Sequence, residues 1–146
     1  MPNDPEICSC AALRQATRHV TRLYDAALAP VGLSLNQYAI LARLKRHGPM
    51  RLKDLADNLV TDRSTLGHLV RPLERRGLVA LAVGPDDRRS RRLQLTAAGL
   101  DHAARAYDLW AGVEAGFAEA FGVAEAAALR RTLKRVESVE LGRQVV

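Results

Sequence analysis

Residues 62–77, DRSTLGHLVRPLERRG, constrain the fold more than any other stretch of the chain. Apolar side chains recur in it at the helical spacing i, i+3, i+4 and i+7, at Leu66, Leu69, Val70 and Leu73. This spacing predicts a helix with one buried face and one polar, basic face. Asp62 is placed to cap the start of the helix, and Gly77 is placed to end it in the left-handed conformation.

A shorter segment with the same periodicity precedes this helix. Residues 52–59, LKDLADNL, place leucines on one face, and a short polar turn at residues 60–61 joins the two segments. Two helices joined in this way predict a helix-turn-helix, whose second helix enters the major groove of DNA. Short polar and basic side chains on its free face match the donors and acceptors of base edges. The predicted contacts are Asp62, Arg63, Ser64, Thr65, His68, Arg71 and Arg75.

A hairpin is predicted directly after the second helix. Residues 78–83 and 91–96 are strand-like runs, and GPDDRRS between them has the residues of a turn. Arg88 and Arg89 lie at the predicted tip, and Arg91 and Arg92 follow. A narrow minor groove attracts guanidinium groups, so an arginine-tipped hairpin beside a recognition helix predicts a wing. A solvated charged loop is the alternative, and the succession of helix and hairpin favours the wing.

The pattern LxxLAxxLxxDRSTLxxLxxPLERRGLV, followed by DDRRSRRLQLTxxG, resembles the winged-helix regulators of the multiple-antibiotic-resistance (MarR) family. The family's D-x-R wing motif is matched by Asp87 and Arg89, and the resemblance runs from about residue 10 to 100. It implies a mainly α fold with a small β-hairpin wing, flanked by N- and C-terminal dimerisation helices. It also implies a transcriptional regulator, most often a repressor, in which Arg89 enters the minor groove and Asp87 braces the wing.

The basic charge of the chain is concentrated on the predicted DNA-binding segment. Residues 43–92 hold 13 Lys and Arg against 6 Asp and Glu, a net charge of +7, and the rest of the chain has a net charge of −1. Contact with phosphates requires such a localised excess. Binding to a membrane surface would also need an amphipathic helix with large apolar residues, which the sequence lacks.

We expect a single MarR-like domain over residues 1–146. Residues 34–96 are predicted to form the winged helix-turn-helix, and residues 9–29 and 97–142 the dimerisation helices. The apolar stripes of these flanking helices exceed what one subunit can cover, which predicts a two-fold homodimer. Such a dimer places two recognition helices about 34 Å apart, so double-stranded DNA with an inverted repeat is the expected partner.

Several local signals refine the predicted elements. Ser34 and Gln37 are spaced for a capping box at the start of a helix. Residues 50–51 are expected to add a brief strand to the wing, and Thr96 is expected to cap a long helix over about residues 97–121. A final helix is predicted over about residues 123–141.

The sequence contains no run of about 18 apolar residues and no apolar signal core near its start, which predicts a cytoplasmic protein. In that reducing compartment Cys8 and Cys10 are not expected to form a structural disulfide. The four histidines are isolated from one another and from other ligands, so no metal site is predicted. No phosphate-binding glycine loop is present either, and neither a cofactor nor an enzymatic activity is expected.

The resemblance implies a small, often aromatic, acidic effector bound between the first, second and long helices. The residues predicted to line its site are Arg18, His19, Tyr24, Tyr38 and Trp110. Each has a structural alternative, with the three aromatic residues in the core and the other two on solvated helix faces.

An oxidant is the second candidate signal. Residues 10–24, CAALRQATRHVTRLY, look like the CxALxxxSRxxTxxY stretch of the hydroperoxide-sensing branch of the family, which implies a reactive thiol at Cys10 with Tyr24 as its hydrogen-bond donor. The two lie about 21 Å apart along a helix, so the donor would come from a partner subunit. The branch has two further tyrosines, which correspond to Arg14 and Leu35 here, although Arg14 can itself favour a thiolate. A buried, unreactive cysteine and a thiol peroxidase are the remaining alternatives.

Overall fold

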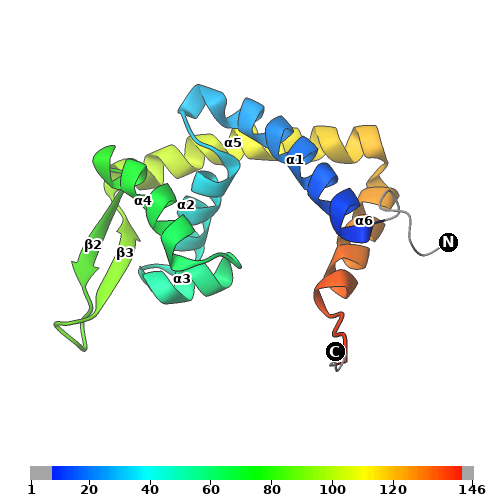
Figure 1. Cartoon of the computed structure of the whole chain (residues 1–146). Coiled ribbons are helices and arrows are strands. Elements are labelled where there is room, and N and C mark those ends of the chain that lie inside the picture. The colour runs from blue at the N-terminus through cyan, green and yellow to red at the C-terminus, as the bar shows by residue number, and fades with distance from the viewer. Residues whose placement is uncertain (1–7, 143–146) are drawn as a thin grey trace. The chain divides into compact units, whose positions relative to one another are not determined.

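The structure is a computed structural model that describes residues 8–142. It is mainly helical with one small sheet, so the predicted fold class is confirmed (Figure 1). The elements in chain order are α1 (Ser9–Leu28), the 3-10 turn η2 (Ala29–Val31), α2 (Leu35–His47), β1 (Met50–Arg51), α3 (Leu52–Asn58), α4 (Arg63–Arg75), β2 (Val79–Val83), β3 (Arg91–Leu95), α5 (Ala97–Phe121) and α6 (Val123–Glu137). The described residues form two compact units, residues 8–110 and 111–142.

Short-range hydrogen bonds cap the helices of the first unit at the residues that the sequence predicts. Ser34 Oγ accepts the N–H of Gln37 at 3.1 Å, and Gln37 Oε1 accepts the N–H of Ser34 at 3.1 Å, which completes the capping box at α2. Thr96 Oγ1 accepts the N–H of Gly99 at 3.0 Å at the start of α5. Gly77 has φ of 70°, so the predicted left-handed residue after α4 is confirmed.

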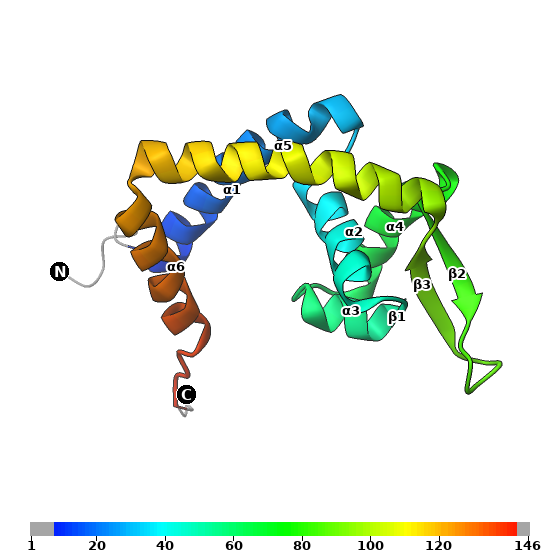
Figure 2. The same ribbon diagram turned by 180° about the vertical axis from the view of Figure 1, so that it is seen from behind.

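The sheet has three antiparallel strands in the order β1-β3-β2. Met50 pairs with Leu93, and the hairpin register runs from Val79 opposite Leu95 to Val83 opposite Arg91. Both the hairpin and the brief strand predicted at residues 50–51 are therefore confirmed. Figure 2 shows β1 leading directly into α3, which brings the start of α3 close to the hairpin.

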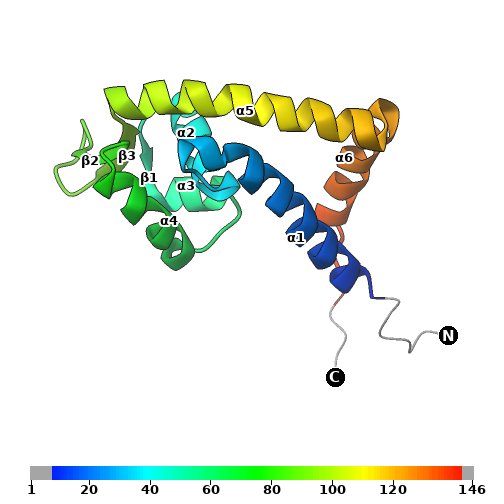
Figure 3. The same cartoon turned by 90° about the horizontal axis from the view of Figure 1, so that it is seen from above.

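The core of the first unit consists mainly of leucines, together with valines, alanines, Ile40 and Tyr38, and the helices α1 to α5 and the sheet all contribute to it. The largest fully buried side chains are Leu28, Ile40, Leu41, Leu55, Leu66, Leu73 and Leu93. The predicted stripe of α4 lies in this core, because Leu66, Val70 and Leu73 are buried and Leu69 packs against them. Burying that stripe leaves the opposite face of α4 in solvent (Figure 3).

Arg76, directly after α4, fixes the C-terminal end of the helix. Its guanidinium donates to the backbone oxygens of Gly32 at 2.7 Å and Val31 at 3.1 Å. The oxygen of Val31 also lies 2.6 Å from Nε2 of His102, on α5. One side chain therefore joins α4 to the turn after α1, and the histidine adds α5 to the same point.

The second unit contains the end of α5 and the whole of α6. Ala126 is its buried residue, and Arg130 pairs with Glu114 at 3.5 Å. The predicted end of the last helix is wrong, since α6 ends at Glu137 and not near residue 141. Residues 138–142 are exposed, so no packing stabilises another turn, and the Ser138 hydroxyl donates to the backbone oxygen of Arg135 at 2.8 Å.

None of the helices in residues 8–142 has the length and apolar character needed to cross a membrane.

Candidate nucleic-acid interface

The free face of α4 carries every residue predicted to contact DNA from this helix. Arg63, Ser64, Thr65, His68, Arg71 and Arg75 are all exposed, as is Asp62 just before the helix. None of them has a side chain committed to the core. The helix thus presents polar groups at its start and arginines toward its end, as reading base edges and phosphates requires.

Asp62 holds the first turn of this helix. Its Oδ1 accepts the N–H of Thr65 at 2.7 Å, and its Oδ2 accepts the Thr65 hydroxyl at 2.8 Å. These hydrogen bonds, the backbone bond first, lower the pKa of Asp62 below its ordinary value. The carboxylate is therefore ionised at neutral pH and keeps the cap in place beside Arg63 and Ser64.

The hairpin turn is closed by its own hydrogen bonds. Asp87 Oδ1 accepts the N–H of Arg89 at 2.9 Å, and the backbone oxygen of Asp87 accepts the N–H of Ser90 at 3.0 Å. The guanidinium of Arg91 donates to the backbone oxygen of Arg88 at 3.1 Å. The side chains of Arg88 and Arg89 remain exposed at the tip. Asp87 thus fixes the backbone at the residue whose side chain is predicted to enter the minor groove.

A basic hollow joins the hairpin to the helix-turn-helix. It has a volume of about 470 Å³ and is lined by Arg51, Leu52, Lys53, Arg63, Leu81, Asp87, Arg89, Ser90 and Arg91. The structure therefore brings the start of α4 together with three of the predicted wing residues. Arg51 and Lys53 were not among the predicted contacts. Their only sequence signal is their place in the basic segment, because the strand pairing that brings them to the hairpin is not local.

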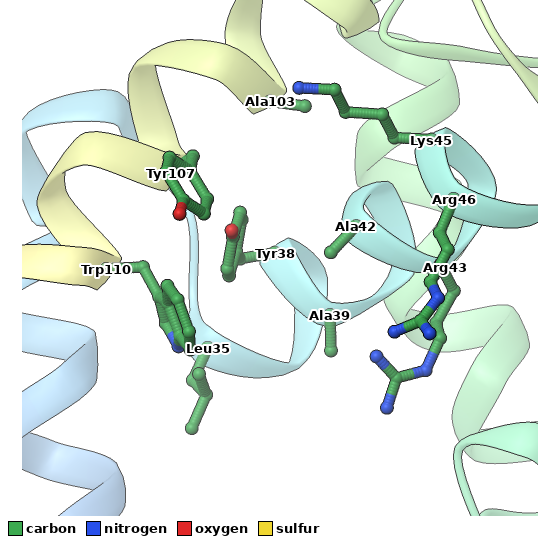
Figure 4. A pocket seen from close by; sticks show the side chains of 10 residues that line it. All are labelled: Leu35, Tyr38, Ala39, Ala42, Arg43, Lys45, Arg46, Ala103, Tyr107 and Trp110. Carbon is green, nitrogen blue, oxygen red and sulfur yellow. The ribbon is translucent and has the colours of Figure 1, made fainter. Parts of the chain in front are cut away.

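A second cavity, the aromatic pocket, lies between α2 and the first half of α5. It has a volume of about 630 Å³ and is lined by Leu35, Tyr38, Ala39, Ala42, Arg43, Lys45, Arg46, Ala103, Tyr107 and Trp110 (Figure 4). The ring of Trp110 lies 6.2 Å from that of Tyr38 and 5.8 Å from that of Tyr107, between centroids. Figure 4 shows these rings on one side of the pocket and the two guanidinium groups on the other.

The structure brings together only two of the five residues predicted for an effector site. Tyr38 and Trp110 line the aromatic pocket, whereas Arg18 and His19 are exposed on α1 and Tyr24 is a buried residue outside the pocket lining. Sequence reasoning missed Tyr107, although its spacing of three residues from Trp110 places both on one face of a helix. It also missed the basic side chains at the end of α2.

Two features of the aromatic pocket bear on what it can bind. Burial, and next the neighbouring Tyr107, raise the pKa of Tyr38, so its phenol is neutral at physiological pH and can donate a hydrogen bond. Arg43 Nε donates to Oδ1 of Asn58 at 2.6 Å, which connects the basic side of the pocket to the last residue of α3. The pocket therefore pairs an apolar aromatic wall with cations and adjoins the helix-turn-helix.

Both cysteines are free and exposed at the start of α1. In this chain Cys10 is therefore not the buried residue that one of the alternatives assumes. Arg14 and Arg18 line the same shallow hollow as Cys10. Within residues 8–142, no group of three or more His, Cys, Asp or Glu side chains is placed to hold a metal ion.

Comparison with known proteins identifies the family. The family model described as "MarR family" matches residues 33–90. The chain is also 30% identical to the transcriptional regulator MosR of M. tuberculosis, solved in complex with DNA, with a TM-score of 0.75 over 92% of this chain and 99% of that one. The chain belongs to the MarR family.

Other MarR-like proteins extend this comparison. The transcriptional repressor CouR, solved on a 23-mer DNA duplex, is 28% identical with a TM-score of 0.84, over 94% of this chain and 97% of that one. CouR has also been solved bound to p-coumaroyl-CoA. The organic hydroperoxide resistance transcriptional regulator of Bacillus subtilis is 28% identical over 90 residues, 62% of this chain. That match spans 61% of the length of the B. subtilis protein.

Proposed function

We propose that this MarR-family protein is a homodimeric transcriptional regulator, acting as a repressor, that binds an inverted-repeat operator in double-stranded DNA. The observation that carries the proposal is a single exposed basic surface made by α4, the start of α3 and the arginine-tipped hairpin. Its arginines and lysines belong to the segment that holds the whole basic excess of the chain. DNA-bound structures of MosR and CouR support the assignment.

Exposed apolar side chains on the second unit support the homodimer. Phe121 is 50% exposed, Val123 72%, Leu133 36% and Val136 43%. These side chains lose contact with water if a second copy covers them, and burial of apolar surface is the main favourable term in association. A two-fold dimer also presents two copies of α4 to successive turns of one DNA face.

The proposal predicts tight, salt-dependent binding to the DNA upstream of the protein's own gene. Fluorescence anisotropy of a labelled duplex is expected to show two chains per site and a higher affinity than for a scrambled duplex. Log affinity should fall steeply with log salt concentration, because each neutralised phosphate releases a counterion. A flat salt response would instead identify a winged helix that serves only as a protein-interaction module.

We further propose that a small aromatic acid bound in the aromatic pocket releases the DNA. The rings of Tyr107 and Trp110 offer stacking surfaces, the neutral phenol of Tyr38 can donate to a carboxylate, and Arg43 can pair with it. A carboxylate that draws Arg43 away removes its bond to Asn58 and frees the end of α3, next to α4. The binding of p-coumaroyl-CoA by CouR supports an aromatic ligand in this family.

Oxidation of Cys10 is the second candidate signal. The thiol is exposed, so an oxidant can reach it from solvent, and Arg14 and Arg18 line the same hollow. The name of the Bacillus subtilis relative supports a hydroperoxide as the oxidant. Such a switch would act at the start of α1 and would not require the aromatic pocket.

One experiment separates the two signals. The preformed protein–DNA complex is treated with 4-hydroxycinnamate or salicylate in one series and with cumene hydroperoxide in the other, while anisotropy is followed. Binding of the acids is expected to quench the fluorescence of Trp110, the single tryptophan. Release of the DNA by the acids is expected to be weaker in Arg43→Ala than in the wild type and unchanged in Arg18→Ala. Release by the hydroperoxide that Cys10→Ser resists would assign the thiol switch instead.

A further inference from the structure

The basic hollow concentrates positive charge that the protein itself does not neutralise. Five basic side chains line it, from Arg51, Lys53, Arg63, Arg89 and Arg91, against the single carboxylate of Asp87. That carboxylate accepts a backbone N–H of the hairpin, and none of the ion pairs found among residues 8–142 involves any of the five cations. Like charges gathered in one hollow repel one another, so an anion bound there is favoured.

The position of the hollow indicates which anion fits. In the proposed complex α4 lies in the major groove and the tip of the hairpin in the adjacent minor groove. The two grooves of a duplex are separated by one sugar–phosphate strand, so that strand has to pass between α4 and the hairpin. The hollow lies at this place, with Arg63 at the start of α4 on one side and Arg89 and Arg91 of the hairpin on the other.

We propose that Arg51 and Lys53 hold a backbone phosphate of this strand in the basic hollow. The inference rests on the proposed DNA-binding function and adds two residues to it. Both side chains are exposed, and Arg51 ends β1 while Lys53 lies in the first turn of α3, so both are outside the recognition helix and the hairpin. Their contacts are therefore to phosphate and fix the position of the protein on the duplex, without reading the sequence of bases.

The strand pairing explains how these two residues reach the phosphate. Arg51 pairs with Arg92 in the β1–β3 ladder, so β1 is attached to the hairpin near the end of β3 that follows the turn. Leu52 and Leu81 form the apolar part of the same hollow. The ladder thus sets the distance between the hairpin and the start of α3, and a phosphate bound by both would hold the wing against the helix-turn-helix.

The test is the salt dependence of DNA binding by the double variant Arg51→Ala/Lys53→Ala. Log affinity against log salt is measured by anisotropy on two short duplexes, the upstream DNA and its scrambled version. The slope is expected to fall in magnitude by about 0.9, since each neutralised phosphate contributes about 0.9 and the two side chains hold one phosphate. Affinity should fall by the same factor on both duplexes, because the lost contacts carry no sequence information.

Two controls make the result specific. The double variant Arg131→Ala/Arg135→Ala removes the same charge from exposed positions of α6 and is expected to keep the wild-type slope. The exchange Arg51→Lys/Lys53→Arg preserves the charge and should also keep it. Equal thermal unfolding midpoints establish that the variants are folded.

The remaining outcomes distinguish the inference from the function on which it rests. A wild-type slope in Arg51→Ala/Lys53→Ala, with steep dependence in the wild type, would overturn the phosphate assignment and leave DNA binding intact. A changed preference between the two duplexes would also overturn it, because it would mean that these residues read sequence. A flat response of the wild-type protein itself would instead refute the proposed function.

Discussion

Gly99→Ala is expected to destabilise the protein by about 3 kcal/mol, at the upper end of the usual cost of overpacking. Gly99 is buried in the first turn of α5, where an added Cβ would overlap the backbone oxygen of Leu78. That oxygen accepts the N–H of Thr96 at 3.1 Å, so it cannot withdraw without breaking the link between α5 and the hairpin. A fall of about 10 °C in the unfolding midpoint is expected by circular dichroism or calorimetry.

Gly67→Ala is the matched control for this substitution. Gly67 lies inside α4, and a Cβ there would meet nothing within 4 Å. Alanine is favoured over glycine in a helix interior by about 1 kcal/mol, so this variant is expected to unfold at the wild-type temperature or above it. An unchanged midpoint in Gly99→Ala would mean that α5 and the start of β2 separate at little cost, contrary to the packing described above.

The contrast between these glycines illustrates how far the sequence predicts the fold. The caps at Ser34 and Asp62 and the left-handed Gly77 depend on residues within one turn, and local spacing predicts all three correctly. The close approach of Gly99 to Leu78 joins residues in different elements, so no local pattern contains it. The end of α6 was predicted wrongly because apolar spacing continues past Glu137, where nothing packs against it.

The same distinction applies to the candidate sites. The predicted face of α4 and the hairpin arginines Arg88, Arg89 and Arg91 are exposed as expected, because periodicity and turn residues determine which side chains face solvent. Residues brought to a site by tertiary packing escape this reasoning. Tyr107 meets Tyr38 through the packing of α5 against α2, and Arg51 meets the hairpin through strand pairing. Their roles in binding remain predictions for the experiments above.

Arg89→Ala is expected to weaken DNA binding by about tenfold or more, in line with the loss of about 1–3 kcal/mol for an arginine that contacts DNA directly. The side chain is exposed at the hairpin tip and its backbone is held by Asp87, so the backbone of the turn is ordered before DNA binds. A narrow minor groove has enhanced negative potential. The loss should therefore be larger on a duplex with A-tracts flanking the half-sites than on one with G·C pairs there.

Variants of the neighbouring aspartate separate the guanidinium from the turn that presents it. Asp87→Asn keeps an oxygen that accepts the N–H of Arg89 and is expected to bind DNA at least as well as the wild type, whereas Asp87→Ala loses the bond. In Asp87→Ala the removal of an acidic group favours binding, and the loosened turn opposes it. If Asp87→Ala has a smaller preference for the A-tract duplex than Asp87→Asn, the hydrogen bond that holds the turn is needed to place the Arg89 guanidinium in the minor groove. If Arg89→Ala bound both duplexes as tightly as the wild type does, the hairpin would not be a minor-groove wing.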